Sequence, residues 1–248
     1  MKIAVVHPNL NLKGGAEYVS LQFLEALQEE HDLELITLQE PDTKELNGFY
    51  DTKIEDTKFR TPGFPYSIFS STSENFNKMR NSSIKKYALK HQDEYDLLIS
   101  THNEAGFGQK GLQYIHFPER INESKMRDEQ IFSTDLSENA APVYKIYNKM
   151  LETFFLPSKE AIEETPALCN SEFTKEAFQR AYETDAEVLN PPVSIEFKDE
   201  NNFENRKNGF VSIGRICPPK GQKQAIKIID ELRENYDVDL HIIGRTET

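Results

Sequence analysis

Apolar residues along this chain fall into short runs that alternate with stretches of helical spacing. The short runs, rich in Val, Ile and Leu, predict strands over residues 3–6, 33–38, 96–100, 112–116, 166–169, 187–189, 210–213 and 240–243. Apolar positions three and four residues apart predict helices over 16–29, 74–91, 143–155, 173–182 and 222–235. Strands that alternate with helices predict an α/β fold, with parallel sheets covered by helices on both faces.

The polar stretches between these elements divide the chain. Residues 39–73 are polar and carry three prolines, so we interpret them as an irregular segment with one short strand. Residues 119–136 are charged and predict a loop. Residues 198–208 hold almost nothing apolar and are the best linker. We therefore expect a domain over 1–197, a linker over 198–208, and over 209–248 a single βαβ unit that begins a second domain.

Composition and charge narrow the function classes. The 248 residues carry a formal net charge of −13, which argues against general binding to nucleic acid. The two cysteines, Cys169 and Cys217, form no disulfide framework and fit a reducing, cytoplasmic compartment. No apolar run approaches the roughly 20 residues of a membrane-spanning helix.

Ligands of parallel α/β sheets bind beyond the carboxyl ends of the strands, so the residues there are the first candidates for chemistry. After the first predicted strand come Gly14 and Gly15, and then Glu17 in the first turn of a helix. Two glycines before a helix let a ligand approach backbone N–H groups and the positive end of the helix dipole. A phosphate or sugar cradle and an ordinary flexible turn are both consistent with this pattern.

Three histidines also stand at or just beyond the carboxyl ends of predicted strands: His7, His102 and His116. Each could orient a sugar hydroxyl or a leaving group, or transfer a proton. Each could equally be a hydrogen-bonded structural residue. No Asp or Cys stands near them at ligand spacing, so we expect no metal site.

Two cations, Arg215 and Lys220, lie on the loop after the strand at 210–213. An Arg fork and a Lys point charge at a strand's carboxyl end can grip a diphosphate. The alternative is two solvated surface cations. The chain lacks the glycine patterns of dinucleotide-binding and P-loop enzymes after its first strand, and it lacks the serine elbow of hydrolases.

Taken in order, these segments resemble glycosyltransferase family 4, also called group 1, the retaining GT-B enzymes. Segment 7–17 is similar to the family's glycine loop, and segments 169–174 and 189–193 to the region before its linker. Segment 214–221 is similar to its "GR…KG" loop and segment 242–244 to the strand that follows. Segments 7–17 and 114–118 look nearest to the lipid-linked oligosaccharide mannosyltransferases.

The resemblance implies a GT-B type fold and a role for each candidate. Arg215 and Lys220 would bind the donor diphosphate, and Gly14 and Gly15 would pass close to the donor. His116 would lie near the reacting sugar as the catalytic residue. A further set would line the acceptor side: His7, Glu17 and His102. The reaction would transfer a sugar, mannose for the subfamily, from a UDP- or GDP-sugar with retention and without a metal or other cofactor.

The resemblance also implies that the family's second domain continues well beyond Thr248, with an acidic motif that contacts the donor. We therefore expect this chain to be weak or inactive alone, with a missing segment or a second chain completing the site. A lipid-linked acceptor would bring the protein to the cytoplasmic face of a membrane as a peripheral protein, whereas a glycan acceptor would not. The best local basic cluster, on the helix predicted over 74–91, we interpret as a solvated face; it comprises Lys78, Arg80, Lys85, Lys86 and Lys90.

Two alternatives to the transferase stay open. One is a non-catalytic sugar-binding or interaction protein on a degenerate GT-B scaffold. The other is an epimerase of the same architecture that acts on nucleotide sugars.

Overall fold

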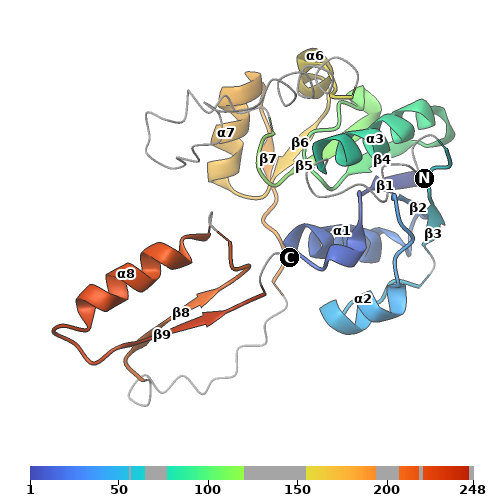
Figure 1. Cartoon of the computed structure of the whole chain (residues 1–248). Coiled ribbons are helices and arrows are strands. Elements are labelled where there is room, and N and C mark those ends of the chain that lie inside the picture. The colour runs from blue at the N-terminus through green and yellow to red at the C-terminus, as the bar shows by residue number, and fades with distance from the viewer. Residues whose placement is uncertain (56, 65–76, 120–154, 194–206, 218–219, 246–248) are drawn as a thin grey trace. The chain divides into compact units, whose positions relative to one another are not determined.

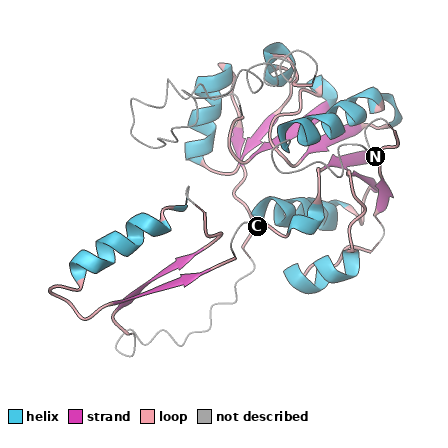
Figure 2. Cartoon of the chain, in the orientation of Figure 1, coloured by secondary structure: helices cyan, strands magenta, loops and turns pink. Residues whose placement is uncertain are grey.

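A computed structural model describes the chain except for residues 56, 65–76, 120–154, 194–206, 218–219 and 246–248 (Figure 1). Two compact units make up the protein, Met1–Val193 and Ser194–Thr248. Figure 2 shows the alternation of helices and strands that the apolar pattern predicts.

A seven-stranded sheet forms the centre of the first unit, in the order β3-β2-β1-β4-β5-β6-β7. Every pairing within it is parallel. Its strands are β1 (Lys2–Val6), β2 (Asp32–Ile36), β3 (Lys58–Arg60), β4 (Leu97–Ser100), β5 (Gly111–Ile115), β6 (Ala167–Cys169) and β7 (Glu187–Val188). The order reverses between β1 and β4, which is the switch point of a doubly wound sheet. The α/β prediction is confirmed.

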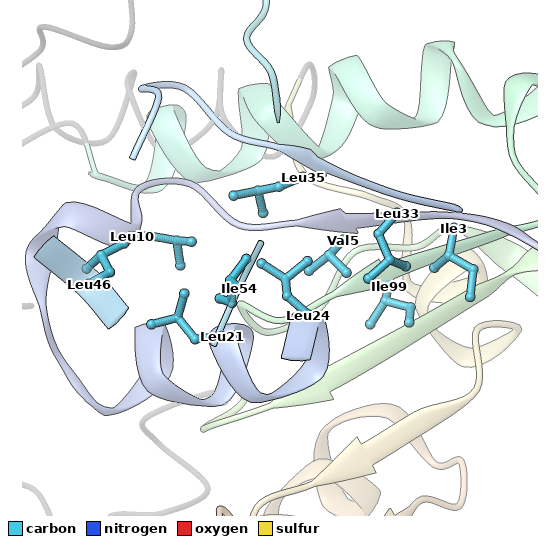
Figure 3. Close-up of a cluster of buried hydrophobic side chains, with 10 residues drawn as sticks. All are labelled: Ile3, Val5, Leu10, Leu21, Leu24, Leu33, Leu35, Leu46, Ile54 and Ile99. Carbon is cyan, nitrogen blue, oxygen red and sulfur yellow. The ribbon is translucent and has the colours of Figure 1, made fainter. Parts of the chain in front are cut away.

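Helices cover both faces of this sheet, as the side chains of β1 show. Ile3 and Val5 pack on one face in a cluster that includes residues of α1 (Gly15–Leu27) (Figure 3). Ala4 and Val6 pack on the other face in a cluster that includes residues of α3 (Asn77–Lys90). Because successive side chains of a strand point to opposite faces, a strand buried on both sides is a continuous apolar run.

A third cluster of buried residues joins the far end of the sheet to two further helices, α6 (Lys159–Glu163) and α7 (Glu172–Tyr182). Ser171 is the N-cap of α7, and its hydroxyl accepts the Thr174 N–H at 3.2 Å. Serine is among the residues preferred at an N-cap, because its side-chain oxygen satisfies a free N–H of the first turn.

One local prediction was wrong. Residues 39–73 are not irregular throughout, because they contain α2 (Thr43–Tyr50) as well as the short strand β3. The Asp42 carboxylate caps α2 by accepting the Glu45 N–H at 2.9 Å, and Leu46 is buried in the core. Pro41 precedes this cap, so it bounds the helix without breaking it. Three 3₁₀ turns complete the first unit as described: Leu10–Leu12, Gln92–Glu94 and Gly108–Lys110.

Three expected segments lie wholly or largely outside the described residues: the helix over 143–155, the loop over 119–136 and the linker over 198–208.

The second unit contains a single βαβ motif in its described residues. Its strands β8 (Gly209–Ile213) and β9 (Asp239–Ile243) pair in parallel, and α8 (Gln222–Leu232) connects them. Gly244 is required here, because a Cβ at this position would lie 1.8 Å from the Gly214 carbonyl oxygen.

Candidate functional site

The candidate residues of the first unit gather at the carboxyl edge of its sheet, around the switch point. His7 follows β1, Thr101 and His102 follow β4, and His116 follows β5. Since β1, β4 and β5 are neighbours and parallel, the three histidines lie along one edge. This is where ligands of doubly wound sheets bind.

The glycine loop enters this edge from β1 and ends at the start of α1. Gly14 is the N-cap of α1, and its N–H donates to Oε2 of Glu17 at 2.8 Å. A Cβ on Gly14 would lie 2.6 Å from that same oxygen, so the closed cap needs glycine. Gly15 is exposed, and a Cβ there would meet nothing within 4 Å. The space in front of Gly15 is therefore open to a ligand.

A buried polar network supports the loop from below. Nε2 of His7 lies 3.4 Å from Oε1 of Glu17, and Nδ1 of His7 lies within hydrogen-bond distance of the hydroxyls of Ser20 (2.8 Å) and Thr101 (3.1 Å). The two hydroxyls also bond to each other. All four side chains are buried. Burial raises the Glu17 pKa, but the hydrogen bond and charge of His7, with backbone N–H groups, outweigh it and hold the pKa below its usual value.

This network has the residue types of a Ser-His-acid triad but the burial of a structural core. Ser20 and Thr101 have no exposed surface, and His7 is 1% exposed. A nucleophile that no substrate can reach does no chemistry, so the network serves to fix the glycine loop. The sequence singled out His7 and Glu17 as acceptor-side residues. The structure brings them together beneath the loop.

His102 packs edge-on against His7, with ring centroids 5.6 Å apart. Its Nδ1 is buried and has no hydrogen-bond partner among the described residues. Burial lowers the pKa of His102 far below its usual value, and the nearby charges of Lys85, His7 and His116 lower it further. The ring is therefore a neutral imidazole at physiological pH.

His116 is half-buried, and both its ring and its backbone are fixed. Its Nε2 lies 3.1 Å from the Thr101 carbonyl oxygen, which can only accept, so Nε2 carries the proton. In the neutral imidazole this leaves Nδ1 as an acceptor. Burial lowers the pKa of His116, more than the Thr101 carbonyl raises it. His116 can thus accept a hydrogen bond from a ligand hydroxyl at neutral pH.

Two asparagines that sequence reasoning did not single out as site residues hold the His116 backbone. Oδ1 of Asn103 accepts the N–H groups of His116 (2.8 Å) and Phe117 (3.2 Å). Asn103 has φ of 57°, a left-handed conformation that Asn tolerates better than most residues. Nδ2 of Asn170 donates to the His116 carbonyl at 3.0 Å. The sequence offered one clue to the role of Asn103, which is that it directly follows a histidine at the end of a strand.

The cation loop belongs to the second unit and runs from Gly214 to Gly221. Arg215 and Lys220 are both exposed. The Arg215 carbonyl accepts from Nε2 of Gln222 at 2.8 Å, which ties the loop to the first turn of α8. Gly221 caps that helix with φ of 70°, in the left-handed region that glycine adopts at least cost. The loop thus presents cations beside a helix N-terminus, an arrangement that suits an anion.

Within the described part of the chain, no group of three His, Cys, Asp or Glu residues is arranged to hold a metal ion. The described helices include none that is long and apolar enough to cross a bilayer.

The strand order, the glycine loop before α1 and the separate βαβ unit define an α/β protein of the GT-B type. Solved structures with a similar fold include glycosyltransferases. WaaG, "a glycosyltransferase involved in lipopolysaccharide biosynthesis", superposes with a TM-score of 0.60 at 14% identity over 99% of this chain and 64% of that one. A glycosyltransferase from Rickettsia africae ESF-5 gives 0.50 at 16% identity over 98% and 60%.

The chain therefore spans less than two thirds of each of these proteins. At such identities the likeness shows the fold. No protein-family model matches the sequence. No curated protein matches it either.

Proposed function

We propose that this chain is the acceptor-side domain and the start of the donor-side domain of a glycosyltransferase. The enzyme would move a sugar from a UDP- or GDP-sugar to a glycan or a lipid-linked acceptor, with retention at the anomeric carbon. Mannose is the sugar that the sequence resemblance favours. One observation carries the proposal. In a fold of the GT-B type, Nδ1 of His116, which can accept a hydrogen bond, lies at the same edge of the sheet as the open glycine loop.

The proposed roles follow from the chemistry of each group. Nδ1 of His116 would accept a hydrogen bond from a hydroxyl of the reacting sugar and so orient its ring. Gly15 would allow the donor to approach the N-terminus of α1, whose N–H groups and dipole favour negative charge. Arg215 and Lys220 would neutralise the charge that develops on the departing nucleoside diphosphate.

Calorimetry of the 248-residue chain with UDP and GDP tests the cation loop directly. We expect wild type to bind one of them, and the double variant Arg215→Ala/Lys220→Ala to bind about tenfold or more weakly, because two charge-assisted contacts are lost. Lys227→Ala is the matched control, since Lys227 is an exposed cation on α8. Equal binding by the double variant and wild type would remove the diphosphate role.

Transfer itself is tested by incubating the protein with UDP- and GDP-sugars and glycan or lipid-linked acceptors, with NMR analysis of the product anomer. Since we expect this chain to be weak or inactive alone, the expected result is retention of configuration in whatever product forms. Binding of a glycan without any nucleotide would favour the non-catalytic alternative, and an epimerised nucleotide sugar would favour the epimerase.

A further inference from the structure

Glu104 is a buried acid that the site described above does not use. It lies in the loop after β4 and is 3% exposed. An ionisable side chain is rarely buried this far without a partner or a task. It lines a small pocket together with Ser82, Lys85, Glu119, Leu156, Pro157, Ile162 and Tyr182.

The hydrogen bonds of Glu104 join three elements. Its Oε1 accepts the Tyr182 hydroxyl of α7 and the Glu119 backbone N–H, each at 2.7 Å. Nζ of Lys85, on α3, donates to the Glu104 carbonyl at 2.7 Å. Oε2 is buried and has no hydrogen-bond partner among the described residues. The carboxyl is thus fixed on one side only.

The Glu119 N–H matters because Glu119 lies three residues after His116. Asn103 accepts the N–H groups of His116 and Phe117, and the adjacent Glu104 accepts that of Glu119. Two consecutive side chains of the β4 loop therefore hold the whole turn that leaves β5. No backbone carbonyl accepts these three N–H groups in the described structure, so the two side chains determine the path of the turn.

We propose that Glu104 is a positioning residue for His116: by holding the Glu119 N–H it fixes the turn 116–119 and hence the orientation of the imidazole. This inference rests on the proposed function, in which His116 contacts the sugar. Tyr182 in turn holds the Glu104 carboxyl, so α7 supports the site from behind.

The charge state of Glu104 bears on how firmly it holds the turn. Burial and the charge of Glu119 raise its pKa to about 7, although the Tyr182 hydroxyl and Lys85 lower it. Glu104 also interacts electrostatically with the Cys169 thiol on β6, whose pKa its charge raises. A carboxylate accepts an N–H more strongly than a neutral acid does, so the turn is held more firmly above neutral pH.

The test is NMR of the 248-residue chain, which needs no catalysis. In Glu104→Ala, the Glu119 amide should exchange about tenfold or more faster and the His116 imidazole signals should shift, because the N–H loses its acceptor. Glu104→Gln keeps an oxygen for the N–H and should restore most of the protection. Glu176→Ala, an exposed carboxylate on α7, is the control and should change neither signal.

A pH series separates positioning from simple packing. In wild type, the chemical shifts of the neutral His116 imidazole should change with a midpoint near pH 7 as Glu104 ionises. Glu104→Gln should abolish that change. If Glu104→Ala does not fold, Tyr182→Phe keeps the ring and should move the midpoint to higher pH. Unchanged Glu119 exchange and His116 signals in folded Glu104 variants would overturn the proposal.

Kinetics then link the two proposals. Where the protein transfers sugar, Glu104→Ala should lower kcat about tenfold and leave the donor KM within about twofold, because orientation and not binding is lost. A wild-type chain that binds no nucleotide, but whose His116 signals still follow Glu104, would contradict the proposed function while the positioning stands. If the wild-type chain transfers sugar but its His116 signals do not respond to the Glu104 substitutions, the proposed function stands and the positioning role is contradicted.

Discussion

Nε2 of His7 lies 3.4 Å from Oε1 of Glu17, and this contact joins the end of β1 to the first turn of α1. The same carboxylate accepts the Gly14 N–H through its other oxygen. Glu17 thus connects the buried network under the sheet edge to the exposed glycine loop. Because both carboxylate oxygens make hydrogen bonds, we expect a substitution at Glu17 to change the stability of the fold and the conformation of the glycine loop together.

Replacing Glu17 by alanine should lower the free energy of unfolding by about 1–2 kcal/mol, since it removes an N-terminal cap and leaves His7 without its acceptor. The Glu17 pKa is lowered in the fold, so its contribution is present above the unfolded pKa and is lost as the pH falls through the folded one. Urea unfolding at pH 7 and pH 3 measures both effects. Glu29→Ala, an exposed acid just after α1, is the control. An equal loss at both pH values would contradict the ionised cap.

The two glycines of the loop should respond differently to alanine. Gly14→Ala places a Cβ against Oε2 of Glu17 and should cost about 0.5–2 kcal/mol by displacing the cap. Gly15→Ala meets nothing within 4 Å and should leave the unfolding free energy unchanged or slightly raised. Under the proposed function, Gly15→Ala should nonetheless weaken binding of the sugar donor, as calorimetry would show. Undiminished donor binding by a stable Gly15→Ala protein would exclude close approach at this glycine.

The sequence alone was enough to predict the strands that consist of a continuous apolar run. Runs such as Ile3–Val6 are buried on both faces of the sheet, so burial and local pattern coincide. The same holds for the strand-end histidines, because any residue that follows a parallel strand must lie at the ligand-binding edge. Helix α2 was missed because its single buried residue, Leu46, gives little periodicity.

The supporting residues were harder to predict, because their partners are distant in sequence. Glu104 bonds to Tyr182, 78 residues away, and nothing local marks the contact. Lys85 was interpreted as part of a solvated basic face, and the structure corrects this: it is 4% exposed, whereas Lys86 and Lys90 are exposed. Helical periodicity identifies buried positions only where the residues are apolar. It cannot identify a charged residue such as Lys85, which is buried because its partners lie inside the protein.

Lys85→Ala should therefore be far more damaging than a surface lysine change. The variant loses the bond to the Glu104 carbonyl and the cation that lies 3.8 Å from the Glu119 carboxylate. We expect a loss of about 2–4 kcal/mol in the free energy of unfolding, against about 0.5 kcal/mol or less for Lys90→Ala on the same helix. Chemical denaturation of both variants measures the difference. Similar stabilities for the two would show that Lys85 is solvated after all.

The raised pKa of Glu104 makes a separate prediction about stability and pH. Its folded pKa, about 7, is above the usual value of 4.5, so the folded chain binds more protons than the unfolded chain between these values. Unfolding free energy should accordingly fall as the pH rises from 5 to 8, by at most about 3 kcal/mol from this group. Glu104→Gln stays neutral, so its decline over the same range should be smaller by that amount.

Comparing the two proteins in urea at pH 5 and pH 8 isolates Glu104, since the other titrating groups are common to both. Glu176→Gln, which removes an exposed carboxylate on α7, should follow wild type at both pH values. Tyr182→Phe should push the decline to higher pH, because the Tyr182 hydroxyl lowers the Glu104 pKa. If wild type and Glu104→Gln lose the same stability between pH 5 and pH 8, then Glu104 is ionised across the whole range. In that case its hold on the turn after His116 cannot vary near neutral pH.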